Sequence, residues 1–279
     1  ATVHDLSGCD HEGEDAKRLA MQLYRAGVRQ AIANTTVSGL LVRTLKQAGM
    51  TVISLVHEQA GVINDNHLLP HAQVIADHAD RIVFPAEQVR REFSTCARLP
   101  EGKTVIRPQG LYKLNHYAST VGRVAAREQL RRQLGLSPEA KVVLCVGYAD
   151  HRKGVDIFVE SGIRLMQSHD DVHCVWVGHT DARMQPKIED RVRESGFGER
   201  FHFTGLASDT DVYYAGADVY VLTSREDPFP SVVMESLQVG VPVVGFQGAG
   251  GFTELLTQGG GCLVPMADVT ALTDAIAEL

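Results

Sequence analysis

The sequence predicts an α/β protein with two Rossmann-like domains that face a cleft. Short apolar runs rich in β-branched residues alternate with stretches of helical spacing, as in helix-covered parallel sheets. The runs are apolar almost without interruption, so both faces of each sheet should be covered. One aperiodic segment, residues 111–122, divides the runs into two sets, and 279 residues are enough for two domains.

The first set predicts an incomplete N-terminal domain over residues 1–112. Its four expected strands are 31–34, 51–56, 81–84 and 104–107. Apolar spacing of three and four predicts a helix over 38–49. A complete doubly wound domain has more strands, and the chain starts at Ala1, so we expect a missing N-terminal part.

The second set predicts a complete domain over residues 113–279. Its six expected strands are 141–147, 172–178, 200–203, 218–222, 241–246 and 261–264. Helices are expected over 155–168 and over 123–135, the latter ending at Gly135 with Pro138 just beyond. The segment 111–122 is interpreted as the connection between the domains.

Composition limits the function classes. The net charge is −7, from 27 basic and 34 acidic residues, and only 6% of residues are aromatic, which disfavours a nucleic-acid partner. No apolar run approaches the roughly 20 residues of a membrane span, and residues 1–18 lack a signal-peptide core. Five scattered cysteines suggest reduced thiols and a cytoplasmic protein; attachment to the inner face of a membrane stays open.

The strongest local pattern spans residues 223–256. A strand ends at Thr223, an acidic loop follows, and a helix can open at Pro230 or Ser231. A helix N-terminus at the carboxyl edge of a parallel sheet attracts phosphate. Asp227 and Glu235 are eight positions apart and could accept hydrogen bonds from vicinal sugar hydroxyls; alternatively, Glu235 caps and Asp227 is solvated.

This segment resembles the retaining GT-B glycosyltransferases of family 4. Their hallmark frame is S-x-x-E-x-F-P-x-x-x-x-E, and residues 224–236 read SREDPFPSVVMES. The resemblance implies that Asp227 contacts the donor sugar and Glu235 binds the ribose, with Glu226 able to compensate for the shorter Asp227. The other residues of the frame expected in the donor site are Phe229, Pro230 and Ser231.

Further motifs match the same family. The frame G-R-x-x-x-x-K-G reads GYADHRKG, so Lys153 would clamp the donor diphosphate, and Arg152 would replace the arginine missing at Tyr148. The glycines expected to let the backbone approach the donor are Gly147, Gly178, Gly250 and Gly251, with Gly205 placed near the base. His57, after an N-terminal strand, would face the donor sugar or serve a structural role.

The resemblance implies that the chain transfers a sugar from a nucleotide-sugar donor to a glycan, lipid-linked or small-molecule acceptor, retaining configuration without metal. His57, Asp227 and Lys153 would be its catalytic residues. Alternatives are a nucleotide-sugar epimerase or phosphorylase on the same fold, or a non-catalytic nucleotide-binding fragment. His67, His71 and His78 have helical spacing but no HExxH pattern, so no metal site is expected. P-loop, GxGxxG and GxSxG motifs are absent from the sequence.

Overall fold

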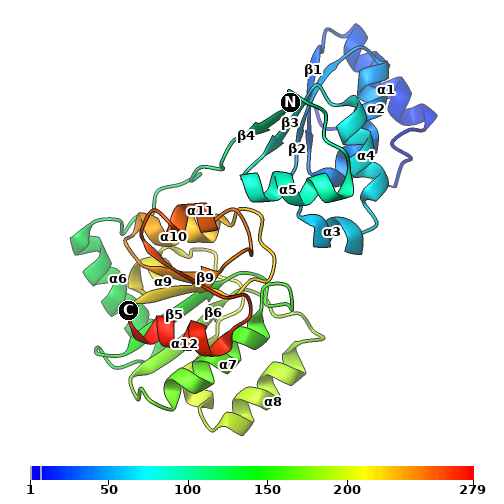
Figure 1. The fold of residues 1–279 in the computed structure, drawn as a ribbon. Coiled ribbons are helices and arrows are strands. Elements are labelled where there is room, and N and C mark those ends of the chain that lie inside the picture. The colour runs from blue at the N-terminus through cyan, green and yellow to red at the C-terminus, as the bar shows by residue number, and fades with distance from the viewer. Residues whose placement is uncertain (1, 7) are drawn as a thin grey trace. The chain divides into compact units, whose positions relative to one another are not determined.

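The structure, a computed structural model, describes residues 2–6 and 8–279. The chain forms two compact units, one ending at Gln109 and one starting at Gly110. In Figure 1 the ribbon of the first unit runs from blue to cyan and that of the second from green to red. Both units consist of a parallel sheet with helices packed on it, which confirms the α/β prediction.

The first unit contains a four-stranded parallel sheet in the order β1-β2-β3-β4. All four predicted strands are present, as β1 Gln30–Asn34, β2 Thr51–Leu55, β3 Arg81–Phe84 and β4 Thr104–Ile106. Its helical segments are α1 Glu14–Arg25, η1 Thr36–Ser38, α2 Gly39–Gln47, α3 Ala60–Asp65, α4 Leu69–His78 and α5 Glu87–Cys96.

The second unit contains a six-stranded parallel sheet in the order β10-β9-β8-β5-β6-β7. The six predicted strands are β5 Lys141–Val146, β6 Val172–Val177, β7 Phe201–Phe203, β8 Val219–Leu222, β9 Val243–Phe246 and β10 Gly261–Val264. The helices are α6 Thr120–Leu134, α7 Val155–Met166, α8 Gln185–Ser195, η2 Gly198–Arg200, α9 Asp211–Gly216, α10 Ser231–Gln238, α11 Thr253–Leu256 and α12 Val269–Ala277. The chain runs from β5 towards one edge and from β8 towards the other, so the strand order reverses between these neighbours.

The core of the second unit is the sheet itself. Strands β8 and β9 are buried at every position, which their unbroken apolar sequence predicts. Helix α7 packs on β6, and α12 packs on β9 and β10. Trp176 and Phe158 meet edge to face in this core, with ring centroids 5.2 Å apart.

Helix α6 begins at Thr120, three residues before the sequence-predicted start at position 123. The reason is the hydroxyl of Ser119, which accepts a hydrogen bond from the backbone N–H of Gly122. The helix ends at Gly135, as predicted, in the left-handed conformation that favours glycine.

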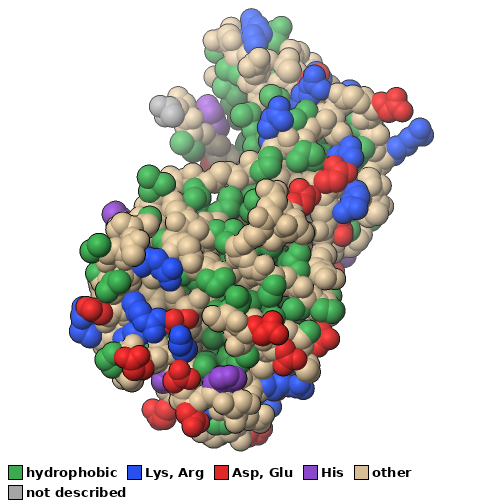
Figure 2. All heavy atoms as spheres, turned by 60° about the vertical axis from the view of Figure 1, so that its left-hand side comes forward, with side chains coloured by type: hydrophobic (Ala, Val, Ile, Leu, Met, Phe, Trp, Pro, Cys, Tyr) green, Lys and Arg blue, Asp and Glu red, His purple; other side chains and the backbone are tan. Residues whose placement is uncertain are grey.

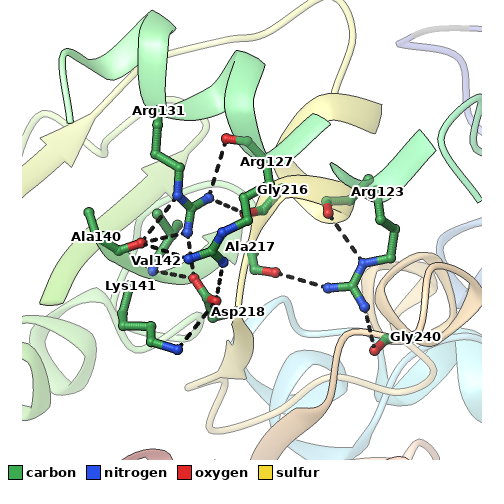
Figure 3. Close-up of polar contacts among 11 residues, drawn as sticks. Arg123, Arg127, Arg131, Ala140, Lys141, Val142, Gly216, Ala217, Asp218 and Gly240 are labelled. Atoms are coloured by element: carbon green, nitrogen blue, oxygen red, sulfur yellow. Dashed lines mark hydrogen bonds and ion pairs between the residues drawn. The ribbon is translucent and has the colours of Figure 1, made fainter. Parts of the chain in front are cut away.

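Three arginines attach α6 to α9 and to the loops that precede β5, β8 and β9 (Figure 3). Arg131 is buried and donates to the carbonyl oxygens of Gly216 and Ala140 and to Asp218. Burial lowers the pKa of Arg131, and the negative charge of Asp218 opposes this shift. Arg127 also pairs with Asp218, and Arg123 donates to backbone carbonyls such as that of Gly240.

The segment interpreted as a connection is held by side chains of the second unit. Lys113 Nζ lies 2.6 Å from Asp211 Oδ1. The backbone N–H of Asn115 donates to Gln238 Oε1 at 2.8 Å, and its side chain donates to the carbonyl of Asp211. Residues from Lys113 onward therefore belong structurally to the second unit.

Surface and thiol chemistry agree with the composition. All five cysteines are free, and Cys145 and Cys174 are buried. Figure 2 shows basic and acidic side chains side by side along the lower part of the visible face. No helix in the part of the chain that the structure describes is long and apolar enough to cross a membrane.

Candidate functional site

The candidate site lies where the strand order of the second unit reverses. The loop after β5, residues 147–154, and the loop after β8, residues 223–230, leave the carboxyl ends of two adjacent parallel strands. Open α/β sheets bind ligands in the crevice at such a reversal. The sequence-predicted Lys153 and Asp227 lie one on each loop.

The two loops are bonded to each other. Lys153 Nζ lies 2.5 Å from Asp227 Oδ2, and the side chains of this pair are only 18% and 8% exposed. Thr223 Oγ1 donates to the carbonyl of Lys153 at 2.9 Å. Arg152 Nη1 donates to the carbonyl oxygen of Glu226, also at 2.9 Å. The structure thus brings the four predicted residues Arg152, Lys153, Glu226 and Asp227 into one cluster.

Asp227 is fixed by partners beyond Lys153. Ser224 Oγ donates to Asp227 Oδ2 at 3.1 Å, and the backbone N–H of Asp227 donates to the carbonyl of Ala249 at 2.7 Å. No role was predicted for Ser224 or Thr223 from the sequence. The sequence could have indicated both as site residues, because they are polar and directly follow a buried strand.

Gly250 has the close approach that the sequence predicted for the glycine-rich turn. A Cβ at this position would lie 1.6 Å from the carbonyl oxygen of Asp227. Next to it, the backbone N–H of Gly251 donates to the carbonyl of Pro228 at 2.7 Å. The turn therefore supports the acidic loop through the backbone, and a side chain at Gly250 would displace that loop.

Helix α10 opens directly after the acidic loop, at the predicted Ser231. Its N-cap, Pro230, has no side-chain acceptor for the first amide groups, so this end keeps donors for an anion. Phe229 and Pro230 are buried and fix the entry of the chain. Glu235 lies on the second turn of α10 and is 9% exposed, so the predicted ribose acceptor is largely shielded from water.

A second hollow adjoins the ends of β6 and β7. Gly178 donates through its backbone N–H to the carbonyl of Gly205 at 2.8 Å, and a Cβ on Gly178 would lie 2.0 Å from the carbonyl oxygen of Gly147. These glycines border a pocket of about 300 Å³, which is also lined by His179 and Phe203. The volume of this pocket lies at the lower end of the range for small-molecule sites.

His57 belongs to the first unit, where it follows β2. Its ring lies between two amide side chains, with Nε2 3.0 Å from Asn34 Oδ1 and Nδ1 3.0 Å from Gln109 Nε2. The adjacent Glu58 accepts hydrogen bonds from the backbone and hydroxyl of Thr36. The imidazole is therefore oriented by its neighbours, and its contact with a donor sugar stays a prediction.

Within residues 2–6 and 8–279, no group of three or more His, Cys, Asp or Glu side chains could hold a metal ion. Among the spaced histidines, His71 Nδ1 contacts the carbonyl of Val37, and His67 has a positive φ of 57° just before α4.

The sequence of the second unit matches a known protein family. Residues 140–279, half of the chain, match the glycosyl transferases group 1 family. The chain belongs to this family. The match covers both loops, α10 and the pocket at β6 and β7, so every part of the candidate site described in the second unit lies within the family region.

Individual family members give more detail. The chain is 31% identical over 157 residues to the lipopolysaccharide core biosynthesis mannosyltransferase LpsB of Rhizobium meliloti, covering 54% of this chain and 44% of that protein. It is 28% identical over 128 residues to mannosylfructose-phosphate synthase of Agrobacterium fabrum, covering 43% and 28%. The chain thus spans less than half the length of these two relatives.

Solved structures confirm the fold. The structure of Anabaena HepE in complex with UDP and glucose matches with a TM-score of 0.81 at 20% identity, covering 95% of this chain and 71% of that chain. Sucrose-phosphate synthase from Thermosynechococcus elongatus matches with a TM-score of 0.74 at 24% identity, covering 95% and 68%. The fold is therefore that of GT-B glycosyltransferases.

Proposed function

We propose that the chain is a glycosyltransferase that moves a hexose from a nucleotide-sugar donor to a hydroxyl-bearing acceptor with retention of configuration. The observation that carries the proposal is the Lys153–Asp227 pair at the strand-order reversal, directly before the helix that carries Glu235. The mannosyltransferase LpsB and the UDP- and glucose-bound HepE support a nucleotide-sugar donor.

Each part of the site has a proposed partner in the donor. Lys153 and the first amide groups of α10 bind the diphosphate, because both present positive charge at one sheet edge. Glu235 accepts hydrogen bonds from the ribose hydroxyls, and Asp227 accepts one from the sugar. The pocket between Gly178 and Gly205 holds the base. Arg152, now bonded to the Glu226 carbonyl, adds positive charge near the diphosphate.

The proposed chemistry breaks the bond between the anomeric carbon and the diphosphate oxygen and forms a bond from the same carbon to the acceptor oxygen. The acceptor hydroxyl gives its proton to the leaving diphosphate. Negative charge grows on that diphosphate in the transition state, and Lys153, Arg152 and the α10 N-terminus are placed to stabilise it. The proposal assigns no metal ion a role.

Calorimetric titration with UDP, GDP, ADP and NAD tests the donor site. We expect one nucleoside diphosphate to bind and Glu235→Ala to weaken it about 10- to 100-fold, because a charged acceptor for the ribose is lost. Glu194→Ala, at an exposed position on α8, is the matched control and should bind like the unaltered chain.

Two results of the titration would contradict the proposed donor site. Binding of none of the four nucleotides would remove the donor site, and equal affinity of Glu235→Ala would remove the ribose assignment. With a bound donor identified, the anomeric coupling constant of the transferred sugar tests retention. An inverted product, or conversion of the donor sugar without an acceptor, would contradict the retaining transferase.

A further inference from the structure

The hydroxyl of Tyr214 is buried next to the proposed donor site without a partner. Tyr214 lies on α9 and is 1% exposed, and among the described residues its hydroxyl makes no hydrogen bond. A buried polar group left unpaired destabilises the folded state. Phenylalanine would fill the same space without this cost. A hydrogen-bond partner that the hydroxyl gains when a ligand binds would explain why the residue is a tyrosine.

Two side chains near this hydroxyl can be excluded as its hydrogen-bond acceptor. The ring packs beside Tyr220, with centroids 5.8 Å apart, but the hydroxyl of Tyr220 is already bonded to the backbone of Val146. The thiol of Cys145 is neutral, because burial raises its pKa to about 12. Neither group supplies the strong acceptor that a buried phenol requires.

Glu235 is the carboxylate that lies close enough to act on this phenol. Helix α10, which carries it, packs on α9. Burial raises the pKa of Tyr214 well above its ordinary value, and the negative charge of Glu235 raises it further. The phenol is therefore protonated and can donate, while the carboxylate can only accept. A carboxylate has about four acceptor positions, which suffice for one phenol and two vicinal hydroxyls.

We infer that Tyr214 is a positioning residue for Glu235: its hydroxyl donates to the carboxylate in the nucleotide-bound state and holds it towards the ribose diol. This inference rests on the proposed function. Glu235 has several rotatable bonds, and ordering such a side chain on binding costs entropy. A bond from the phenol of Tyr214, whose ring is fixed in the core, offsets that cost and holds the carboxylate in place for the ribose.

The test compares Tyr214→Phe with the unaltered chain by calorimetry. The ligands are whichever of UDP, GDP and ADP binds tightest and its 2′,3′-dideoxy analogue. We expect Tyr214→Phe to weaken the nucleotide about tenfold and to leave the dideoxy analogue unchanged. Tyr213→Phe, the half-buried neighbour on the same helix, should change neither. Thermal unfolding should show Tyr214→Phe at least as stable as the unaltered chain.

A double-mutant cycle gives a second measurement. In a Glu235→Ala background, Tyr214→Phe should have no further effect on nucleotide affinity, because its target is gone. Equal weakening of the nucleotide and the dideoxy analogue, unchanged affinity, or additive effects in the cycle would overturn the inference while leaving the proposed function intact. Failure of the unaltered chain to bind any of the three nucleotides would instead overturn the proposed function, and the inference with it.

Discussion

The Lys153–Asp227 pair joins two side chains that the family resemblance assigns to different parts of a bound donor. Their shared burial requires them to compensate each other's charge without a ligand. A diphosphate carries more negative charge than one carboxylate and would compete for the ammonium group. In the proposed function, Lys153 moves to the diphosphate, and Asp227, still held by Ser224, accepts a bond from the sugar.

A single added methyl group at Gly250 would test the close approach of this residue to the loop that carries Asp227. Gly250→Ala would place a carbon against the Asp227 carbonyl, and such overpacking costs about 1–3 kcal/mol. We expect a lower free energy of unfolding in urea and loss of nucleotide binding by calorimetry. Gly198→Ala is the control, because its Cβ would have no atom within 4 Å and its φ is not positive. Equal behaviour of the two variants would contradict the close approach.

At the level of elements, the sequence predicts all ten strands, because each is a short apolar run bounded by turn residues. The start of α6 could not be read from apolar periodicity, since it depends on the hydroxyl of Ser119. The side-chain contacts that hold residues 113–117 on the second unit could not be predicted either, because the partners Asp211 and Gln238 are about 100 residues away in the sequence. Long-range polar contacts of this kind leave no local pattern.

The Arg131 cluster makes a prediction about how α6 is held. Arg131→Met should lower the free energy of unfolding by about 2–3 kcal/mol, because the buried carbonyls of Gly216 and Ala140 lose a charged donor. Denaturation in urea measures this. Arg132→Met, at an exposed position one residue later, should change it by less than about 0.5 kcal/mol. Equal losses in the two variants would contradict the assigned role.

At the scale of the whole molecule, the alternation of strands and helices predicts two α/β units, and the structure contains them. The sequence also places Lys153 and Asp227 at the same sheet edge of the second unit, because loops that follow parallel strands share one edge. Lys153 and Asp227 therefore come together although 74 positions separate them. The orphaned hydroxyl of Tyr214 could not be predicted, because burial without a partner depends on the exact packing of two helices.

Hydrogen–deuterium exchange with and without the bound nucleoside diphosphate tests the central claim, that the loops at the strand-order reversal form the donor site. We expect slower exchange in residues 147–154 and 223–235 and around Gly178 and Gly205, with little change on the far side of the sheet, such as in α6. Protection confined to α6 or to other regions outside these segments, at saturating nucleotide, would contradict the account.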